Sequence, residues 1–223
     1  MEGRIKLLNQ ILRGPDRWPM SRIKAAFTEE EVRAWCAPTD LCTTARRVLM
    51  PLYLSIDVAW CMEYLTWIVD ELGISLDGPV FDEKDNRSNR MAIDCVLNEI
   101  SGIMRVPCAL FLLKRGAQTG FDWNLRLFGE CERLAAGALS EPIIKALLDK
   151  GCFPSVASVS MAPQVGDWAV ARMRTKEVCL LVLVLGKRRT QWSPYVAYDV
   201  WKMIAQHMWE QRWDMQLWRR AAK

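Results

Sequence analysis

Apolar residues recur at helical spacing through the first two thirds of the chain. In the first segment, Ile5, Leu8 and Leu12 fall on one face of a helix. Cap residues such as Thr28 mark helix starts, and Gly or Pro marks helix ends. These signals predict helices over residues 2–13, 28–35, 40–50, 51–73, 89–104, 107–116, 123–137 and 140–151. We therefore expect a helical bundle region over residues 1–151.

The pattern changes after Gly151. Strands are expected over residues 168–173 and 178–185, with a tight polar turn at 174–176 and a third strand over 156–161. The run from Val178 to Leu185 has no polar alternation, so both of its faces should be buried. A long helix is expected from Ser193 to about Arg220. The predicted fold class is mainly α, with a helical bundle region followed by a small α/β region over 152–223. That region would be a β-hairpin or small sheet plus a long C-terminal amphipathic helix, either as a second domain or integrated with the first.

The final predicted helix carries a broad apolar arc. At 100° per residue, one side collects Tyr198, Trp201, Ile204, Ala205, Met208, Trp209 and Met215. Such an arc can pack on its own fold, with Trp201 and Ile204 facing the strands. Trp213 and Trp218 extend the arc to either side and bring it to four tryptophans. The arc is then wider than one small domain needs, which favours self-association. The interface residues predicted on this helix are Trp209, Trp213, Trp218 and Arg212.

Charge is distributed unevenly along the chain. The net charge is +3 up to Met50, −4 from Pro51 to Leu185 and +5 from Gly186 onward, within a total of +4. A basic end can dock on phosphates, on anionic lipid, on an acidic partner protein or on the protein's own acidic middle. The residues predicted to bind anions are Lys187, Arg188, Arg189, Arg219 and Arg220.

Cysteine usage and the N-terminus both favour a reducing compartment. The eight cysteines lie largely within apolar or helical patterns, where free cysteine behaves as a small buried hydrophobe. Residues 1–10 lack the apolar core and cleavage site of a signal peptide. We therefore expect a cytoplasmic or nuclear protein with reduced thiols, either soluble or peripheral on membranes. Residues 48–69 form the only apolar stretch long enough to span a bilayer, but Asp57 and Glu63 within it argue against a transmembrane segment.

Most catalytic chemistries find no support in the residue pattern. His207 is the single histidine and no Cys-x-x-Cys pair occurs, so neither a metal site nor a cofactor is predicted. There is no Gly-x-Ser-x-Gly elbow and no phosphate-binding glycine loop, and no catalytic residue is assigned. Four acids lie within apolar helical patterns, where each is paired, at a solvent-exposed edge or functional: Asp57, Glu63, Asp94 and Glu99. The pairing partners expected for them are Arg46, Arg47, Arg90 and Arg105.

Three function classes remain. The leading hypothesis is a non-catalytic binding and assembly protein that self-associates and docks on an anionic surface through its basic ends, as matrix-like viral or adaptor proteins do. Its eleven tryptophans and eleven methionines would supply adaptable contact surfaces. The second is an RNA- or other nucleic-acid-binding protein that uses residues 187–189 and the arginines of the last helix. The third is an enzyme based on carboxylates or an isolated cysteine.

Overall fold

A computed structural model describes residues 1–14, 17–39, 42–80, 90–100, 102–192 and 198–211, without the side chains of residues 186, 188–192 and 198. The chain divides into two compact units, Met1–Leu125 and Arg126–Lys223. The described residues form helices and no strand, and their β-structure is limited to two isolated bridges. The prediction of a mainly α protein is therefore confirmed. None of the helices in the described part of the chain has the length and apolarity needed to cross a bilayer.

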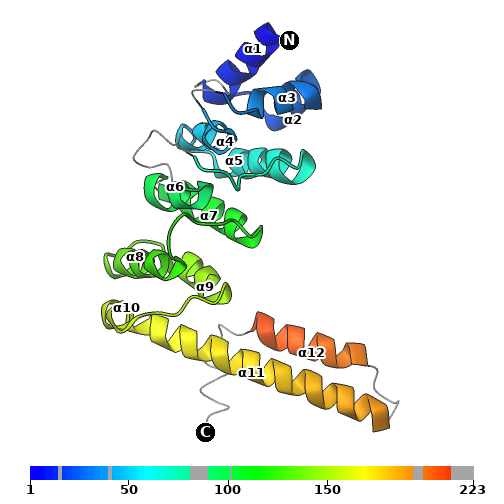
Figure 1. Cartoon of the computed structure of the whole chain (residues 1–223), viewed down its shortest axis with the longest axis vertical. Helices are drawn as coiled ribbons and strands as arrows, with labels where there is room; N and C mark the ends of the chain where they lie inside the picture. The colour runs from blue at the N-terminus through cyan, green and yellow to red at the C-terminus, as the bar shows by residue number, and fades with distance from the viewer. Residues whose placement is uncertain (15–16, 40–41, 81–89, 101, 193–197, 212–223) are drawn as a thin grey trace. The chain divides into compact units, whose positions relative to one another are not determined.

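The first unit is a succession of short helices. They are α1 (Glu2–Arg13), α2 (Met20–Ala26), α3 (Glu29–Cys36), α4 (Thr44–Tyr53), α5 (Val58–Leu65), the π-helical η1 (Thr66–Glu71), α6 (Ala92–Glu99), the 3-10 turn η2 (Gly102–Met104) and α7 (Arg105–Lys114). Helix α4 packs on α6 while α5 packs on α7, so one helix pair lies against the next (Figure 1). Nearest-neighbour packing of helix pairs is the construction of helical-repeat proteins.

Three consecutive helix ends close in the same way. Gly116, Gly137 and Gly151 follow α7, α8 (Trp123–Ala135) and α9 (Glu141–Asp149), each in the left-handed region with φ of 79°, 84° and 99°. The amide that follows each glycine donates to a carbonyl five residues earlier, at 2.9–3.2 Å. These are Schellman closures, which satisfy the last carbonyls of a helix and need glycine at that position. The sequence Leu-Leu-x-x-Gly occurs at residues 112–116 and again at 147–151, a short repeated signature at the ends of α7 and α9.

The single predicted helix over residues 51–73 is two helices in the structure. Pro51 lies inside α4, and the chain leaves that helix after Tyr53. Asp57 is the N-cap of α5, where its carboxylate accepts the Trp60 amide at 3.0 Å. The predicted end is confirmed, because Gly73 follows η1 with a φ of 62°.

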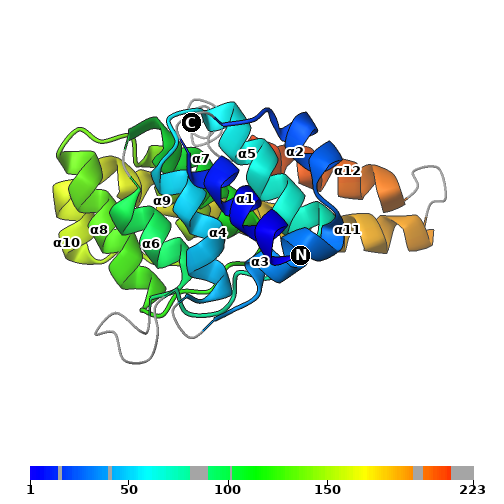
Figure 2. The same cartoon turned by 90° about the horizontal axis from the view of Figure 1, so that it is seen from above.

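The predicted α/β region is wrong. The second unit continues with α9, α10 (Val156–Met161), α11 (Pro163–Trp192) and α12 (Tyr198–Glu210). The segments predicted as strands over 168–173 and 178–185, and the turn between them, all lie within α11. The third predicted strand is α10. Helix α12 packs along the second half of α11, as both views show (Figures 1 and 2).

The composition of α11 explains this outcome. The predicted turn, Arg174-Thr175-Lys176, contains no Gly, Pro or Asn, and between Gly166 and Gly186 the chain has no helix breaker. Thr175 is fully buried, and its hydroxyl donates to the Ala171 carbonyl at 2.8 Å, an i−4 bond that only a helix allows. An apolar run of this length fits a helix as well as a strand, and here the absence of breakers decides between them.

Candidate functional site

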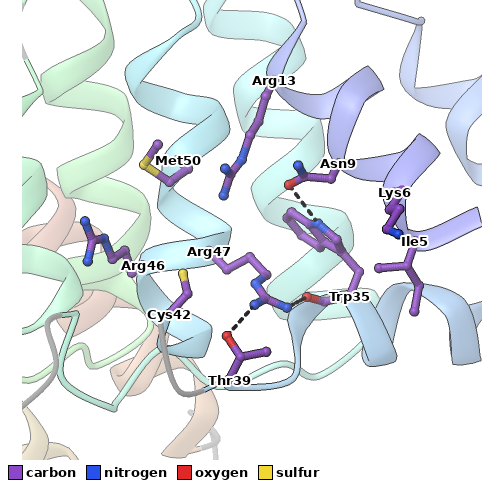
Figure 3. Close-up of a pocket in the computed structure, with 10 residues that line it drawn as sticks. All are labelled: Ile5, Lys6, Asn9, Arg13, Trp35, Thr39, Cys42, Arg46, Arg47 and Met50. Atoms are coloured by element: carbon purple, nitrogen blue, oxygen red, sulfur yellow. Dashed lines mark hydrogen bonds between the residues drawn. The ribbon is translucent and has the colours of Figure 1, made fainter. Parts of the chain in front are cut away.

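A basic cavity of about 460 Å³ opens in the first unit where α1, α3 and α4 meet (Figure 3). Its walls are Ile5, Lys6, Asn9, Arg13, Trp35, Thr39, Cys42, Arg46, Arg47 and Met50. The spacing of four residues between Ile5, Asn9 and Arg13 puts all three on one face of α1. The lining holds four cationic side chains and no carboxylate among the described residues.

The two guanidinium groups at the centre of this cavity are held differently. Arg47 donates to the Trp35 carbonyl at 2.6 Å and to the Thr39 hydroxyl at 3.0 Å, so two neutral oxygens position it. Arg13 extends from α1 into the cavity toward Arg47, and its buried Nε makes no hydrogen bond to a described residue (Figure 3). Neither guanidinium has a carboxylate partner among the described residues.

The remaining lining residues shape the cavity wall. Trp35 is almost fully buried, and its indole nitrogen donates to the Asn9 side chain at 3.4 Å. Lys6 lies at the exposed rim and pairs with Glu2 at 2.8 Å. Ile5 and Met50 add apolar surface. The cavity therefore combines fixed positive charge with apolar walls, which is the composition of a site for an organic anion.

A second candidate surface is the outer face of α11. Six large apolar side chains on this helix are 41–57 % exposed: Val170, Met173, Leu180, Leu181, Val184 and Leu185. At 100° per residue they fall within an arc of about 140°. The exposed Arg174 and Glu177 lie within this arc, and the exposed Lys187 borders it. This surface, called the α11 face below, is more apolar than is usual for a solvent-exposed helix face.

An adjoining side of α11, which includes Leu180, packs against α12 around a shallow groove of about 540 Å³. The Cys179 thiol donates to the Ala205 carbonyl at 3.2 Å across this contact. Burial raises the pKa of Cys179, which keeps the thiol protonated. Trp209, one of the predicted interface residues, is half-buried in the groove wall.

The structure places only some of the other predicted site residues. Lys187 is exposed near the end of α11 rather than in a turn; Arg188 and Arg189 follow it in the helix, with side chains that are not described. Arg212, Trp213, Trp218, Arg219 and Arg220 lie outside the described residues. Trp201 and Ile204 were expected to face strands, but the described part of this unit has no strand; Trp201 is half-buried and Ile204 is 41 % exposed.

Each of the four acids predicted within apolar helices is either exposed or held by a partner within the fold. Asp57 is a helix cap, Glu63 is exposed, and Glu99 pairs with Arg90 at 2.8 Å, one of the pairings expected from the sequence. Asp94 is fully buried, where it accepts the amides of Met91 and Gly120 at 2.9 Å and the Thr119 hydroxyl. This carboxylate ties the start of α6 to the loop after α7.

The described residues offer little else that could carry chemistry. They contain no cluster of three or more His, Cys, Asp or Glu side chains arranged to hold a metal ion. All eight cysteines are free thiols, and six of them are buried. Sequence reasoning did not find the basic cavity, because its residues come from three helices and a loop and only the fold brings them together. No protein family model, curated protein or solved structure matches the chain.

Proposed function

We propose that the protein is a non-catalytic binding and assembly protein that self-associates through the α11 face. The observation that carries this proposal is the row of exposed aliphatic side chains on one side of α11. Burying such a row stabilises association by roughly 25 cal/mol for each Å² of apolar surface removed from water. The alternative occupant of this surface is the segment 212–223 of the same chain.

The arrangement of charges around the α11 face favours a second copy of the chain. Two α11 helices packed antiparallel about a two-fold axis near Val182 would place Leu180 of each copy opposite Val184 of the other. The same axis brings Glu177 of each copy beside Lys187 of the other, because both lie five residues from Val182. One helix face would thus pair its own acidic and basic residues across the two-fold axis.

The interface would be modest in size. The face from Met173 to Lys187 is about 21 Å long at 1.5 Å per residue, so we expect dissociation in about the micromolar range. Sedimentation velocity of the full chain over a concentration series measures this equilibrium. Glu177→Lys or Lys187→Glu alone should weaken the dimer about tenfold, since each creates two like-charge pairs, and the double charge reversal should restore it.

Two controls isolate the surface. Glu132→Lys makes the same charge change on an exposed residue of α8 and should leave association unchanged. Leu181→Glu should abolish the dimer, whereas Leu139→Glu, at a leucine that is 79 % exposed outside the helices, should not. A wild-type chain that stays monomeric at high concentration, and dimerises only after deletion of residues 212–223, would contradict self-association of the native protein.

Docking on an anionic surface through the basic ends remains the second element of this proposal. The exposed Lys187 is compatible with it. Co-sedimentation with anionic vesicles and with RNA across a salt series tests it, because phosphate contacts weaken as salt rises. Binding to neither partner at low salt would remove this element and leave self-association standing.

A further inference from the structure

We propose that the cavity between α1, α3 and α4 binds a small phosphate-bearing organic molecule, with Arg13 and Arg47 as its anchors. This site is independent of the α11 face and of self-association. Its occupant is a soluble anion, whereas the α11 face takes a protein partner.

The charge balance of the cavity is the first step. Placing two guanidinium groups beside one partly enclosed space is unfavourable unless an anion compensates them. In the described part of this unit, four other arginines pair with a carboxylate, among them Arg115 with Asp70 and Arg33 with Glu29. Arg13 and Arg47 have no such carboxylate among the described residues, and we assign their compensation to an anion in the cavity.

The geometry of Arg13 is the second step. Its Nε is shielded from solvent yet makes no hydrogen bond to a described residue, although a buried donor normally has a partner. The side chain points into the cavity (Figure 3). Arg47 is fixed by Trp35 and Thr39, so its guanidinium is already oriented before a ligand arrives. A pre-oriented site loses less conformational entropy on binding.

The ligand class follows from these groups and from the cavity's size. Guanidinium groups present a planar fork that matches phosphate oxygens and binds them bidentately. Two forks, with Lys6 at the rim, suit the double charge of a phosphate group better than the single charge of a carboxylate. A cavity of about 460 Å³ lies in the range for small-molecule ligands, and Ile5 and Met50 offer contact to an apolar portion.

Isothermal titration of the full chain with pyrophosphate at low salt tests the proposal. We expect saturable binding that Arg13→Gln weakens about 10- to 100-fold, the effect of removing one charge-assisted hydrogen-bonding group. Arg13→Lys keeps the charge without the fork and should lie between the two. Arg22→Gln makes the same charge change at an exposed residue outside the cavity and should bind like the wild type.

The outcomes are distinct. Loss of pyrophosphate affinity in Arg13→Gln but not in Arg22→Gln, with both variants melting like the wild type, supports the site. Equal losses in both variants, or no saturable binding by a folded wild-type chain, overturn it. Binding to anionic vesicles or RNA that Arg13→Gln weakens, without binding of pyrophosphate, also overturns it and assigns the arginines to a macromolecular surface.

Discussion

At the scale of single residues, burial controls the chemistry of the thiols. Burial raises the pKa of Cys36, Cys95 and Cys108 from 9.0 to about 12, because a thiolate loses solvation in the protein interior. In the unfolded chain the same thiols ionise near their ordinary value. Between about pH 9 and pH 12 the unfolded state therefore binds fewer protons than the native state, and the free energy of unfolding must fall as pH rises.

Denaturant unfolding at pH 7 and pH 10 measures this effect. Cys108→Ala should lose less stability between the two pH values than the wild type, by on the order of 1 kcal/mol. Cys42→Ala is the control, since Cys42 is only half-buried. Burial raises the pKa of Tyr53 and Tyr64 in the same direction, so the wild type keeps a background slope that the comparison of variants removes. Equal slopes in all three proteins would contradict the assignment.

The residue types predicted roles within one helical turn, such as helix capping, better than they predicted hydrogen-bond partners that are distant in the sequence. Thr28 and Glu31 form the capping box that their spacing predicts, with the Thr28 amide donating to the Glu31 carboxylate at 2.9 Å. Asp94 looked equally polar within an apolar pattern, but its partners Thr119 and Gly120 lie 25 and 26 residues away. Contacts over such distances depend on the fold, so no local pattern could reveal them.

At the scale of elements, α11 shows where hydrophobic patterning fails. Within residues 178–185, the exposed side chains are Leu180, Leu181, Val184 and Leu185. The groove beside α12 is lined by Cys179, Leu180 and Leu183. An apolar face meant for a partner removes the alternation of polar and apolar positions that normally identifies an amphipathic helix. Most helices before Gly151 show that alternation of polar and apolar positions. Their predicted bounds are therefore close to the observed ones.

A proline substitution distinguishes the helix from the predicted hairpin. Arg174 is exposed in α11 and lies in the predicted turn, where a proline would be tolerated. In a continuous helix, Arg174→Pro removes a backbone hydrogen bond and clashes with the preceding turn, which costs about 3 kcal/mol. Circular dichroism melts of Arg174→Pro and Arg174→Ala measure the difference. A proline variant as stable and as helical as the alanine variant would favour the hairpin.

At the scale of the whole molecule, the helical class was predictable and the pairing of helices was not. The repeated Leu-Leu-x-x-Gly ends are short and occur only twice in the sequence. A repeat is recognised by constant period, which this chain lacks in its first unit. The basic cavity depends on that pairing, since α1, α3 and α4 supply its walls together.

Nearest-neighbour packing predicts how damage spreads through the first unit. Leu97 is 1 % exposed in α6, which packs on α4 and α7. Leu97→Ala should cost about 2–5 kcal/mol by leaving a cavity. In a helix-pair array the loss concentrates in adjoining elements, so amide hydrogen exchange should accelerate in α4, α6 and α7 more than in α1 and α3. Leu139→Ala, at an exposed leucine, serves as the control. Uniform acceleration from α1 to α7 would instead mean that the unit opens as one cooperative body, with α1 and α3 tied to α6 as tightly as its direct neighbours.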